Sequence, residues 1–384
     1  METVVDRPLQ LADFSDKETG ELMKDAAFRV IVGLVLLLSP VFHHTAYACT
    51  TFVVGEGGTQ LLGRNYDFGF GDGYIMINKR GVSKAGYESR LAGENGRPAV
   101  WISKYGSITF NQYGREFPQG GMNEAGLIVE AMALTPTRFP QPDSRPYLPN
   151  TLLWRQYLLD TCASVKDVIE SDSKVRVSYD ASKGVGTHFL ILDREGNAAA
   201  VEFLDGKMVV YHDDSLPVPV LTNSTYEESL SFFREKRFPA EDQWDSIHRF
   251  VTAADLVGKS DRIELRSELD HSFDILAAVT WPQTKWSIVY DNQDLRIYLT
   301  TSGNPGIRTV ELNRFDLSCK SPVKILEIHS GPEGDVTRKF QDYSQGINAT
   351  LVKTSFGKLK SRVPVPSQVI ELMSGYPERC ECRE

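Results

Sequence analysis

The chain has 384 residues, with 42 Lys+Arg against 51 Asp+Glu, a formal charge of −9, 41% hydrophobic residues and five cysteines. This length and composition predict a large hydrophobic core, in one big domain or two smaller ones, and exclude a disordered or collagen-like chain. The acidic balance and the lack of any Lys/Arg run in the sequence argue against nucleic acid as a partner, and five scattered cysteines are too few for a disulfide scaffold.

Residues 1–48 have the features of a leader that is removed. The apolar run 30–38 is too short to cross a bilayer, which takes about 20 residues, but has the length of a signal-peptide core. Basic residues precede it, and Ala46-Tyr47-Ala48 supplies small residues at the −3 and −1 positions of a signal peptidase site. We therefore expect cleavage between Ala48 and Cys49 and export, either periplasmic or secreted, with no membrane attachment after processing.

Other interpretations of this segment stay open. The apolar run could be a buried core helix, and the acidic residues 1–22 have the wrong sign for a signal-peptide start, which makes Met23 an alternative first residue. Cys49 could be the lipid acceptor of an exported lipoprotein, although Ala46 stands where such leaders usually carry Leu. A lipid-anchored protein, or an inactive binding protein that keeps the fold, would then replace an enzyme.

Cleavage before Cys49 would give this residue a free α-amine beside its thiol. An α-amine has a pKa of roughly 7.7–8.0 and can take the thiol proton directly or through one water. The thiol is the strongest side-chain nucleophile near neutral pH, so one processed residue supplies both nucleophile and base. No histidine is then required, and those after the leader lie in no recognisable thiol-protease signature and are expected to be ordinary: His188, His212, His248, His271 and His329.

The residues after Cys49 predict a β-hairpin. Residues 50–54 have the pattern of a strand, 55–58 of a glycine-rich turn and 60–63 of the returning strand. The hairpin would bring Arg64, Asn65 and Asp67 back to Cys49, where an arginine lowers a thiol pKa and an aspartate can hold an α-amine. Alone, such a hairpin would be an ordinary salt-bridged turn.

The rest of the chain predicts an α+β protein in one domain, with no linker and no internal repeat. Strands cluster early and late with helices between them, which favours α+β over an alternating parallel sheet. The predicted strands are 99–104, 127–133, 188–193, 198–204, 286–291 and 296–300. The predicted helices are 151–162, 226–235, 244–257 and 271–281.

Five motifs in order resemble the choloylglycine hydrolase family, the bile salt hydrolases and penicillin V acylases of the N-terminal nucleophile (Ntn) superfamily. Cys49-Thr50 followed by Gly63-Arg64-Asn65-x-Asp67 is similar to the family's start, and residues 121–127 (GMNEAGL) to its Asn-Glu-x-Gly-Leu turn. Residues 220–224 (VLTNS), 246–251 (SIHRFV) and 286–291 (WSIVYD) resemble its later segments. Together they span about 240 residues.

The resemblance implies a four-layer αββα sandwich, in which two stacked antiparallel sheets are flanked by helices, formed by residues 49–336 with a C-terminal extension, 337–384, packed on or trailing the same domain. It implies hydrolysis of a linear, non-peptide amide through an acyl-thioester on Cys49, with no cofactor and no metal. The substrate would be a conjugated bile salt, penicillin V or an N-acyl homoserine lactone. Relatives are often tetramers, so a homo-oligomer, tetramer or dimer, is expected without an interface signal in the sequence.

Two further catalytic residues are implied by the resemblance alone. Asn223 matches the family's oxyanion side chain, although its position would also suit the cap of a helix beginning near Tyr226. Arg249 matches a late catalytic arginine. Where many relatives carry a second Asn donor, this chain has Ala133, so only its backbone N–H is a candidate.

Some aromatic and cysteine residues have two interpretations. The aromatics after the hairpin could line an acyl pocket or fill the core between the sheets: Tyr66, Phe68, Phe70 and Tyr74. Cys380 and Cys382 lack the nearby histidines of a zinc site. They belong either to a mobile tail or to a disulfide with Cys162 or Cys319.

Overall fold

The computed structural model describes residues 48–55, 60–88, 96–178, 185–237, 245–259, 267–359 and 365–383. The expected apolar leader segment and most of the predicted turn at 55–58 lie outside the described residues. Within these ranges no helix is both long and apolar enough to cross a bilayer.

The N-terminal hairpin lies near one edge of a seven-stranded sheet. The strand order is β14-β1-β2-β15-β16-β17-β19, and all neighbours are antiparallel except β17 and β19. The strands are β1 (Thr50–Val54), β2 (Leu61–Asp67), β14 (Val220–Leu221), β15 (Thr284–Asp291), β16 (Arg296–Thr301), β17 (Asn304–Glu311) and β19 (Gly334–Asp335).

A nine-stranded antiparallel sheet forms the second layer, in the order β13-β12-β11-β8-β7-β6-β3-β18-β20. Its strands are β3 (Tyr74–Asn78), β6 (Ser107–Asn111), β7 (Pro118–Asn123), β8 (Ile128–Ala133), β11 (Thr187–Leu192), β12 (Ala198–Leu204), β13 (Lys207–His212), β18 (Lys324–Glu327) and β20 (Gln341–Asp342). Two small sheets add β9 (Tyr147–Leu148) with β10 (Arg176–Val177), and β4 (Val82–Ala85) with β5 (Val100–Ile102) and β21 (Glu381–Cys382).

The two large sheets stack through one apolar core. Phe52 and Ile288 from the first sheet and Phe110 and Leu190 from the second belong to the same buried cluster. Every residue of β2 is buried, as expected for a strand covered on both faces. Gly63 is required there because a Cβ at this position would lie 2.3 Å from the Phe52 ring, so the glycine lets Phe52 cross β2.

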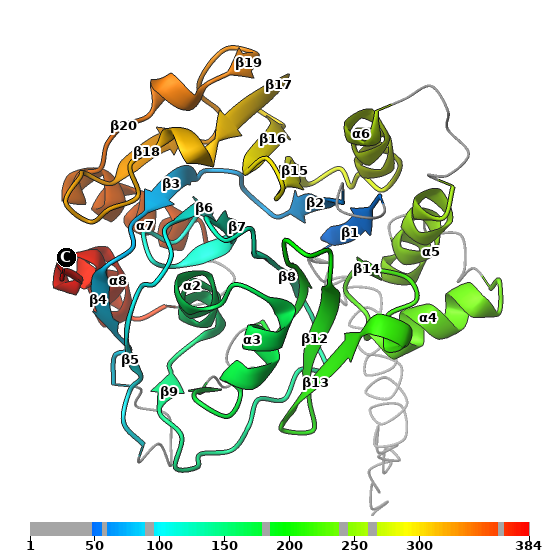
Figure 1. Cartoon of the computed structure of the whole chain (residues 1–384), viewed down its shortest axis with the longest axis horizontal. Coiled ribbons are helices and arrows are strands. Elements are labelled where there is room, and N and C mark those ends of the chain that lie inside the picture. Colours follow the sequence, from blue (N-terminus) through cyan, green and yellow to red (C-terminus); the bar gives the residue numbers. More distant parts are fainter. Residues whose placement is uncertain are drawn as a thin grey trace, which may run out of the picture. The chain divides into compact units, whose positions relative to one another are not determined.

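Helices cover the outer faces of the sheets and complete four layers (Figure 1). Helices α5 and α6 pack against β1 and β2, while α2 packs against β7 and β8. The helices are α2 (Thr151–Thr161), α3 (Val165–Ser171), α4 (Tyr226–Arg234), α5 (Ser246–Val257), α6 (Glu268–Ala278), α7 (Gln345–Leu359) and α8 (Ser367–Gly375), with a 3-10 turn η6 (Tyr376–Arg379). The α+β sandwich predicted from the sequence is confirmed.

Most predicted elements are present with small shifts at their ends. The last predicted helix, 271–281, is shifted toward the N-terminus, because Ser267 accepts a hydrogen bond from Asp270 N and caps a helix that begins at Glu268. The described part of the chain from Ala48 onward forms one compact unit, and the C-terminal helices α7 and α8 pack on it.

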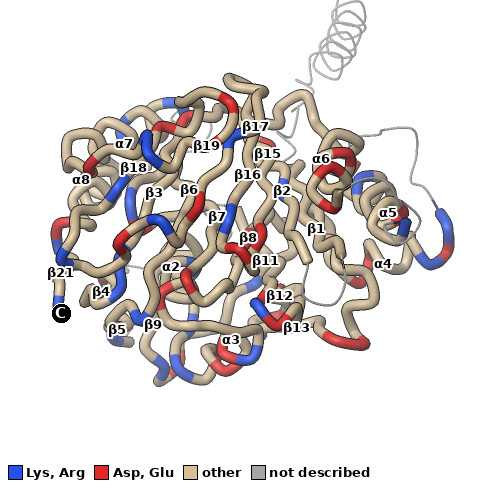
Figure 2. The backbone as a smooth tube through the Cα atoms, turned by 45° about the horizontal axis from the view of Figure 1, so that its top comes forward, with Lys and Arg blue, Asp and Glu red and all other residues tan. Residues whose placement is uncertain are grey.

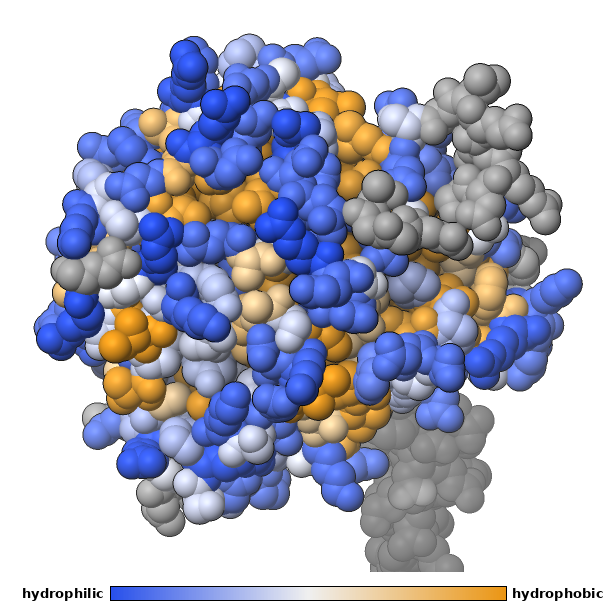
Figure 3. Space-filling view, in the orientation of Figure 1, coloured by the Kyte–Doolittle hydropathy of each residue, from blue (hydrophilic) through white to orange (hydrophobic). Residues whose placement is uncertain are grey.

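The surface mixes charges of both signs. Figure 2 shows Lys and Arg interspersed with Asp and Glu along many elements. The face seen in Figure 3 is largely hydrophilic, with apolar residues showing between the charged ones.

Candidate active site

Cys49 lies immediately before β1, and the hairpin register brings β2 residues beside it. Thr50 pairs with Asn65 and Thr51 with Arg64. The Cys49 Sγ lies 3.9 Å from the carbonyl oxygen of Asp67. The predicted hairpin is confirmed, and it brings Arg64 and Asp67 to the thiol.

The Asp67 carboxyl group is buried with one satisfied and one unsatisfied oxygen. Oδ1 accepts a hydrogen bond from Thr284 Oγ1. Oδ2 has no hydrogen-bond partner among the described residues. Burial raises the pKa of Asp67 to about 7, against the opposing effects of Thr284 and of nearby arginines.

Arg64 is held by a buried carboxylate that the sequence analysis did not single out. Its Nη1 pairs with Glu130 Oε2, and its Nη2 donates to Ala131 O at 3.0 Å. Glu130 also accepts from Tyr290 Oη. Gly120 makes room for this carboxylate, because a Cβ there would lie 2.2 Å from Glu130 Oε2. A glutamate inside an otherwise apolar predicted strand was the available signal.

The environment of the thiol raises its pKa overall. Burial is the largest cause, and the Asp67 charge acts in the same direction. Arg64 opposes both by Coulombic attraction and by hydrogen bonding to the thiolate. In this form of the chain, in which Cys49 is still joined to Ala48, the thiol therefore needs a base before it can attack.

Arg249 connects the start of β1 to Asn223. From the first turn of α5, its Nη1 donates to Ala48 O at 2.5 Å, to Cys49 O at 2.7 Å and to Thr50 Oγ1 at 2.8 Å. Its Nη2 donates to Asn223 Oδ1 at 2.9 Å. The guanidinium thereby fixes the backbone on both sides of the Ala48–Cys49 bond.

Asn223 lies beside the same strand and does not cap a helix. β14 pairs with β1 through Thr51 and Leu221, and Asn223 follows two residues later. Its Nδ2 donates to Ala133 O at 2.9 Å, and its backbone N–H donates to Ser246 Oγ at 2.9 Å. The cap of α4 is Thr225, whose side chain accepts from Glu228 N, so the capping interpretation of Asn223 is wrong.

Ala133 ends β8 and lines the cavity described below. The N–H of the next residue, Leu134, points toward β11, because it donates to the carbonyl oxygen of Gly186 just before that strand. Because successive residues of a strand point their N–H groups to opposite edges, the N–H of Ala133 faces away from β11. This is the same edge on which Ala133 O accepts from Asn223.

A buried His–Glu pair supports the segment that carries Asn223. His188 Nε2 lies 2.8 Å from Thr222 O, and its Nδ1 lies 2.9 Å from Glu202 Oε1. Glu202 Oε1 also accepts from Tyr226 N at 2.9 Å. His188 is thus a core residue that fixes the backbone next to Asn223, which its isolated position in the sequence does not reveal.

A cavity of about 440 Å³ opens onto Cys49. Arg64, Asp67, Arg155 and Ala133 lie in its wall. Most of the remaining wall is apolar, and its lining includes Tyr66, Phe68, Tyr87, Tyr113, Met132, Leu152, Val185, Phe356, Leu359, Val365, Pro366, Val369 and Met373.

The predicted aromatic lining is only partly found. Tyr66 and Phe68 line the cavity, and their rings stack with centroids 5.7 Å apart. Phe70 packs edge-on against Phe68 at 5.0 Å and is not in the cavity wall. Tyr74 is half-buried, packs against a separate small cluster that contains Met76, and is not in the cavity wall.

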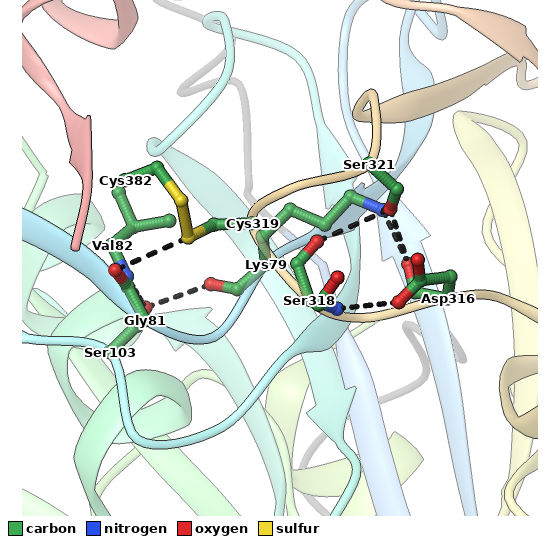
Figure 4. The surroundings of a disulfide bond; sticks show 9 residues. All are labelled: Lys79, Gly81, Val82, Ser103, Asp316, Ser318, Cys319, Ser321 and Cys382. Atoms are coloured by element: carbon green, nitrogen blue, oxygen red, sulfur yellow. Dashed lines mark hydrogen bonds between the residues drawn. A yellow bond between two sulfur atoms is a disulfide. The ribbon is translucent and has the colours of Figure 1, made fainter. Parts of the chain in front are cut away.

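One of the two C-terminal cysteines forms a disulfide bond and the other is a free thiol. Cys382 forms a disulfide with Cys319, one of the pairings left open by the sequence, with a Cα–Cα distance of 5.4 Å (Figure 4). Cys49, Cys162 and Cys380 are free thiols. In the described parts of the chain no three His, Cys, Asp or Glu side chains gather as metal ligands would.

Comparison with known proteins identifies this architecture. The sequence model of the linear amide C–N hydrolases, choloylglycine hydrolase family, matches residues 49–249, just over half of the chain. The chain therefore belongs to the choloylglycine hydrolase family, and it is a hydrolase of linear amide C–N bonds.

Individual relatives are distant. A penicillin V acylase of Pectobacterium atrosepticum is 24% identical over 269 residues, which cover 57% of this chain and 69% of the relative. The structure of penicillin V acylase from Agrobacterium tumefaciens matches with a TM-score of 0.64 and 24% identity, covering 77% of this chain and 98% of that one. The structure of a mutant of conjugated bile acid hydrolase from Clostridium perfringens matches with a TM-score of 0.58 and 18% identity. This match covers 75% of this chain and 98% of that one. These structural likenesses establish the Ntn-hydrolase fold.

Proposed function

We propose that Cys49, freed as the first residue by cleavage after Ala48, is the nucleophile of an exported amide hydrolase. The observation that carries this proposal is the convergence of Arg64 and Asp67 on one buried thiol at an apolar cavity. Arg249 adds to it by donating hydrogen bonds both to the Cys49 carbonyl oxygen and to Asn223. The family match also begins at residue 49.

In the proposed reaction the α-amine of Cys49 takes the thiol proton, and Sγ attacks the amide carbonyl. The tetrahedral intermediate collapses, the C–N bond breaks, and the protonated α-amine returns the proton to the leaving amine. Water then hydrolyses the acyl-thioester and regenerates the thiol. Asp67 Oδ2, which has no hydrogen-bond partner in the described part of the chain, would accept a hydrogen bond from the α-amine and hold it next to Sγ.

Asn223 and the backbone N–H of Ala133 are the proposed oxyanion donors. A side-chain amide carries two N–H groups, so Asn223 Nδ2 can keep its bond to Ala133 O and still donate to an oxyanion. Arg249 donates to Asn223 Oδ1, which fixes the orientation of the amide. A preorganised donor of this kind contributes on the order of 10²–10³ in kcat.

Burial of the cleavage site supports processing before folding is complete. Ala48 is fully buried and Cys49 is 4% exposed, so a separate protease has no access to the bond between them in the folded domain. Signal peptidase, which acts while a chain is being exported, would meet the site unfolded. Localisation outside the cytoplasm is part of this proposal and fits the Cys319–Cys382 disulfide.

The mostly apolar cavity supports an acyl donor such as a conjugated bile salt, penicillin V or an N-acyl homoserine lactone. The test is to incubate protein that begins at Cys49 with glycocholate, taurocholate, penicillin V and N-dodecanoyl homoserine lactone, and to measure the released amine. We expect hydrolysis of at least one substrate, and its loss in Cys49→Ser with an unchanged circular dichroism spectrum. Full activity of Cys49→Ser, or an intact mass showing a blocked or lipidated Cys49, would disprove the mechanism.

A further inference from the structure

The C-terminal segment supplies a large part of the apolar cavity wall. Six of its residues line the cavity, and all lie beyond the stretch matched by the family model: Phe356, Leu359, Val365, Pro366, Val369 and Met373. None carries a nitrogen or oxygen atom in a polar side-chain group. Resting on the function proposed above, we propose that residues 345–359 and 365–383 form the acyl-binding wall and select substrates with a long apolar acyl chain.

The segment is anchored to the body of the protein by buried polar contacts. In α7, Ser355 Oγ donates to Gln112 O at 2.6 Å, and Asn348 Oδ1 accepts from Arg115 N at 2.8 Å. Asn348 Nδ2 donates to Ser374 O at 3.0 Å, which ties α7 to the end of α8. The wall is therefore held against the nine-stranded sheet, whose strand β8 also contributes Met132 and Ala133 to the cavity wall.

The end of the segment is fixed a second time. Cys382 pairs with Val82 in the small sheet and is covalently bonded to Cys319, which follows β17 (Figure 4). Arg383 N donates to Gly81 O at 2.8 Å. A wall held at both ends presents a constant surface to a bound chain, so contacts with it can discriminate between acyl groups.

An aliphatic chain is the group that gains most from such a wall. Each methylene group that moves from water into an apolar site increases the binding constant about fourfold. A longer acyl chain covers more of this apolar wall, so kcat/KM is expected to rise with chain length until the chain fills the cavity. This chain-length dependence is the specific prediction of the proposal.

The test uses butanoyl and dodecanoyl amides of whichever amine the protein is found to release. Val369 is suited to substitution because it lines the cavity and is 37% exposed, so Val369→Lys adds a charge to the wall without opening the core. Gln368→Lys is the matched control, since this neighbouring residue on α8 is exposed and outside the cavity wall. Thermal unfolding of both variants checks that they are folded.

We expect Val369→Lys to lower the ratio of kcat/KM for the dodecanoyl amide to kcat/KM for the butanoyl amide by about tenfold or more. Gln368→Lys should change neither substrate. Equal hydrolysis of both chain lengths by the unmodified protein, or an equal loss on both in Val369→Lys, would overturn the acyl-wall proposal while leaving the nucleophile assignment intact. Failure of every amide tested would instead contradict the proposed function.

Discussion

Arg249 Nη2 donates to Asn223 Oδ1 at 2.9 Å, so that Asn223 Nδ2 faces Ala133 O at 2.9 Å. The Nη1 of the same guanidinium donates to the carbonyl oxygen of Cys49 at 2.7 Å. One buried side chain thus orients the proposed oxyanion donor and positions the proposed nucleophile. An amide whose oxygen is fixed by an arginine cannot flip without losing a charge-assisted hydrogen bond.

This relationship predicts that Asn223 and Arg249 act as one unit. Asn223→Ala should lower kcat by about 10²–10³, the effect of losing one oxyanion donor. Arg249→Gln should lower kcat by at least the same factor, because the Asn223 amide loses its fixed orientation. The kcat of the double variant should be only slightly below that of Arg249→Gln alone. Steady-state kinetics of the four proteins measures this coupling. Independent, multiplicative losses in kcat would show that Arg249 does not act through Asn223.

Two charged groups of opposite sign act on the thiol and can be separated by mutation. In the uncleaved form, with Cys49 still joined to Ala48, Asp67→Asn should lower the thiol pKa and Arg64→Gln should raise it. The pH dependence of the rate of alkylation by iodoacetamide measures both shifts. Arg64→Lys, which keeps the positive charge, is the control and should return the thiol pKa toward that of the unmodified chain. Shifts of the same sign in Asp67→Asn and Arg64→Gln would rule out this electrostatic account.

The buried Asp67 predicts a pH dependence of stability. Its folded pKa of about 7 lies above the unfolded value of 3.8, so the folded uncleaved chain holds a proton that the unfolded chain releases. Its contribution to the free energy of unfolding should therefore fall as pH rises from about 4 to about 7, and level off above that. Urea unfolding at pH 4.5 and pH 7.5 measures this effect. The free energy of unfolding should fall less between these two pH values in Asp67→Asn than in the unmodified chain.

Exposed Glu371 offers a matched control for that comparison, since Glu371→Gln also removes one carboxylate. Glu371→Gln should leave the difference in unfolding free energy between pH 4.5 and pH 7.5 as it is in the unmodified chain. Cleavage that creates a cationic α-amine beside Asp67 is expected to lower its pKa and reduce the pH dependence further. An identical pH dependence in the unmodified chain and in Asp67→Asn would argue against a raised pKa at this site.

Short-range patterns in the sequence were enough to find the centre of the site. The strand–turn–strand pattern after Cys49 fixes the register that brings Arg64 and Asp67 to the thiol, because a hairpin joins residues close in sequence. Asn223 and Arg249 came only from resemblance to the family. The contact of Arg249 with Asn223 and with Cys49 depends on how α5 packs against β1, which local periodicity does not specify.

The missed features all depend on long-range packing. Glu130 is joined to Arg64 across the two stacked sheets, so its role follows from how they pack. Phe356 and Met373 reach the cavity because α7 and α8 fold back onto the nine-stranded sheet, more than 300 residues after Cys49. Nothing in the apolar pattern of a terminal helix distinguishes a cavity wall from ordinary core packing.

The disulfide between Cys319 and Cys382 predicts a redox-dependent stability. It closes a loop with a sequence separation of 63, for which the loss of chain entropy in the unfolded state corresponds to about 4 kcal/mol as an upper estimate. Cys382→Ser should lower the free energy of unfolding by up to that amount, and dithiothreitol should destabilise the unmodified protein but not the variant. Cys380→Ser, two residues away at a free thiol, should keep the full response to reductant. If the unmodified protein unfolds at the same urea concentration with and without reductant, the bridge does not stabilise the folded chain, and the C-terminal segment is held by its non-covalent contacts, such as the hydrogen bonds to Gln112 and Arg115.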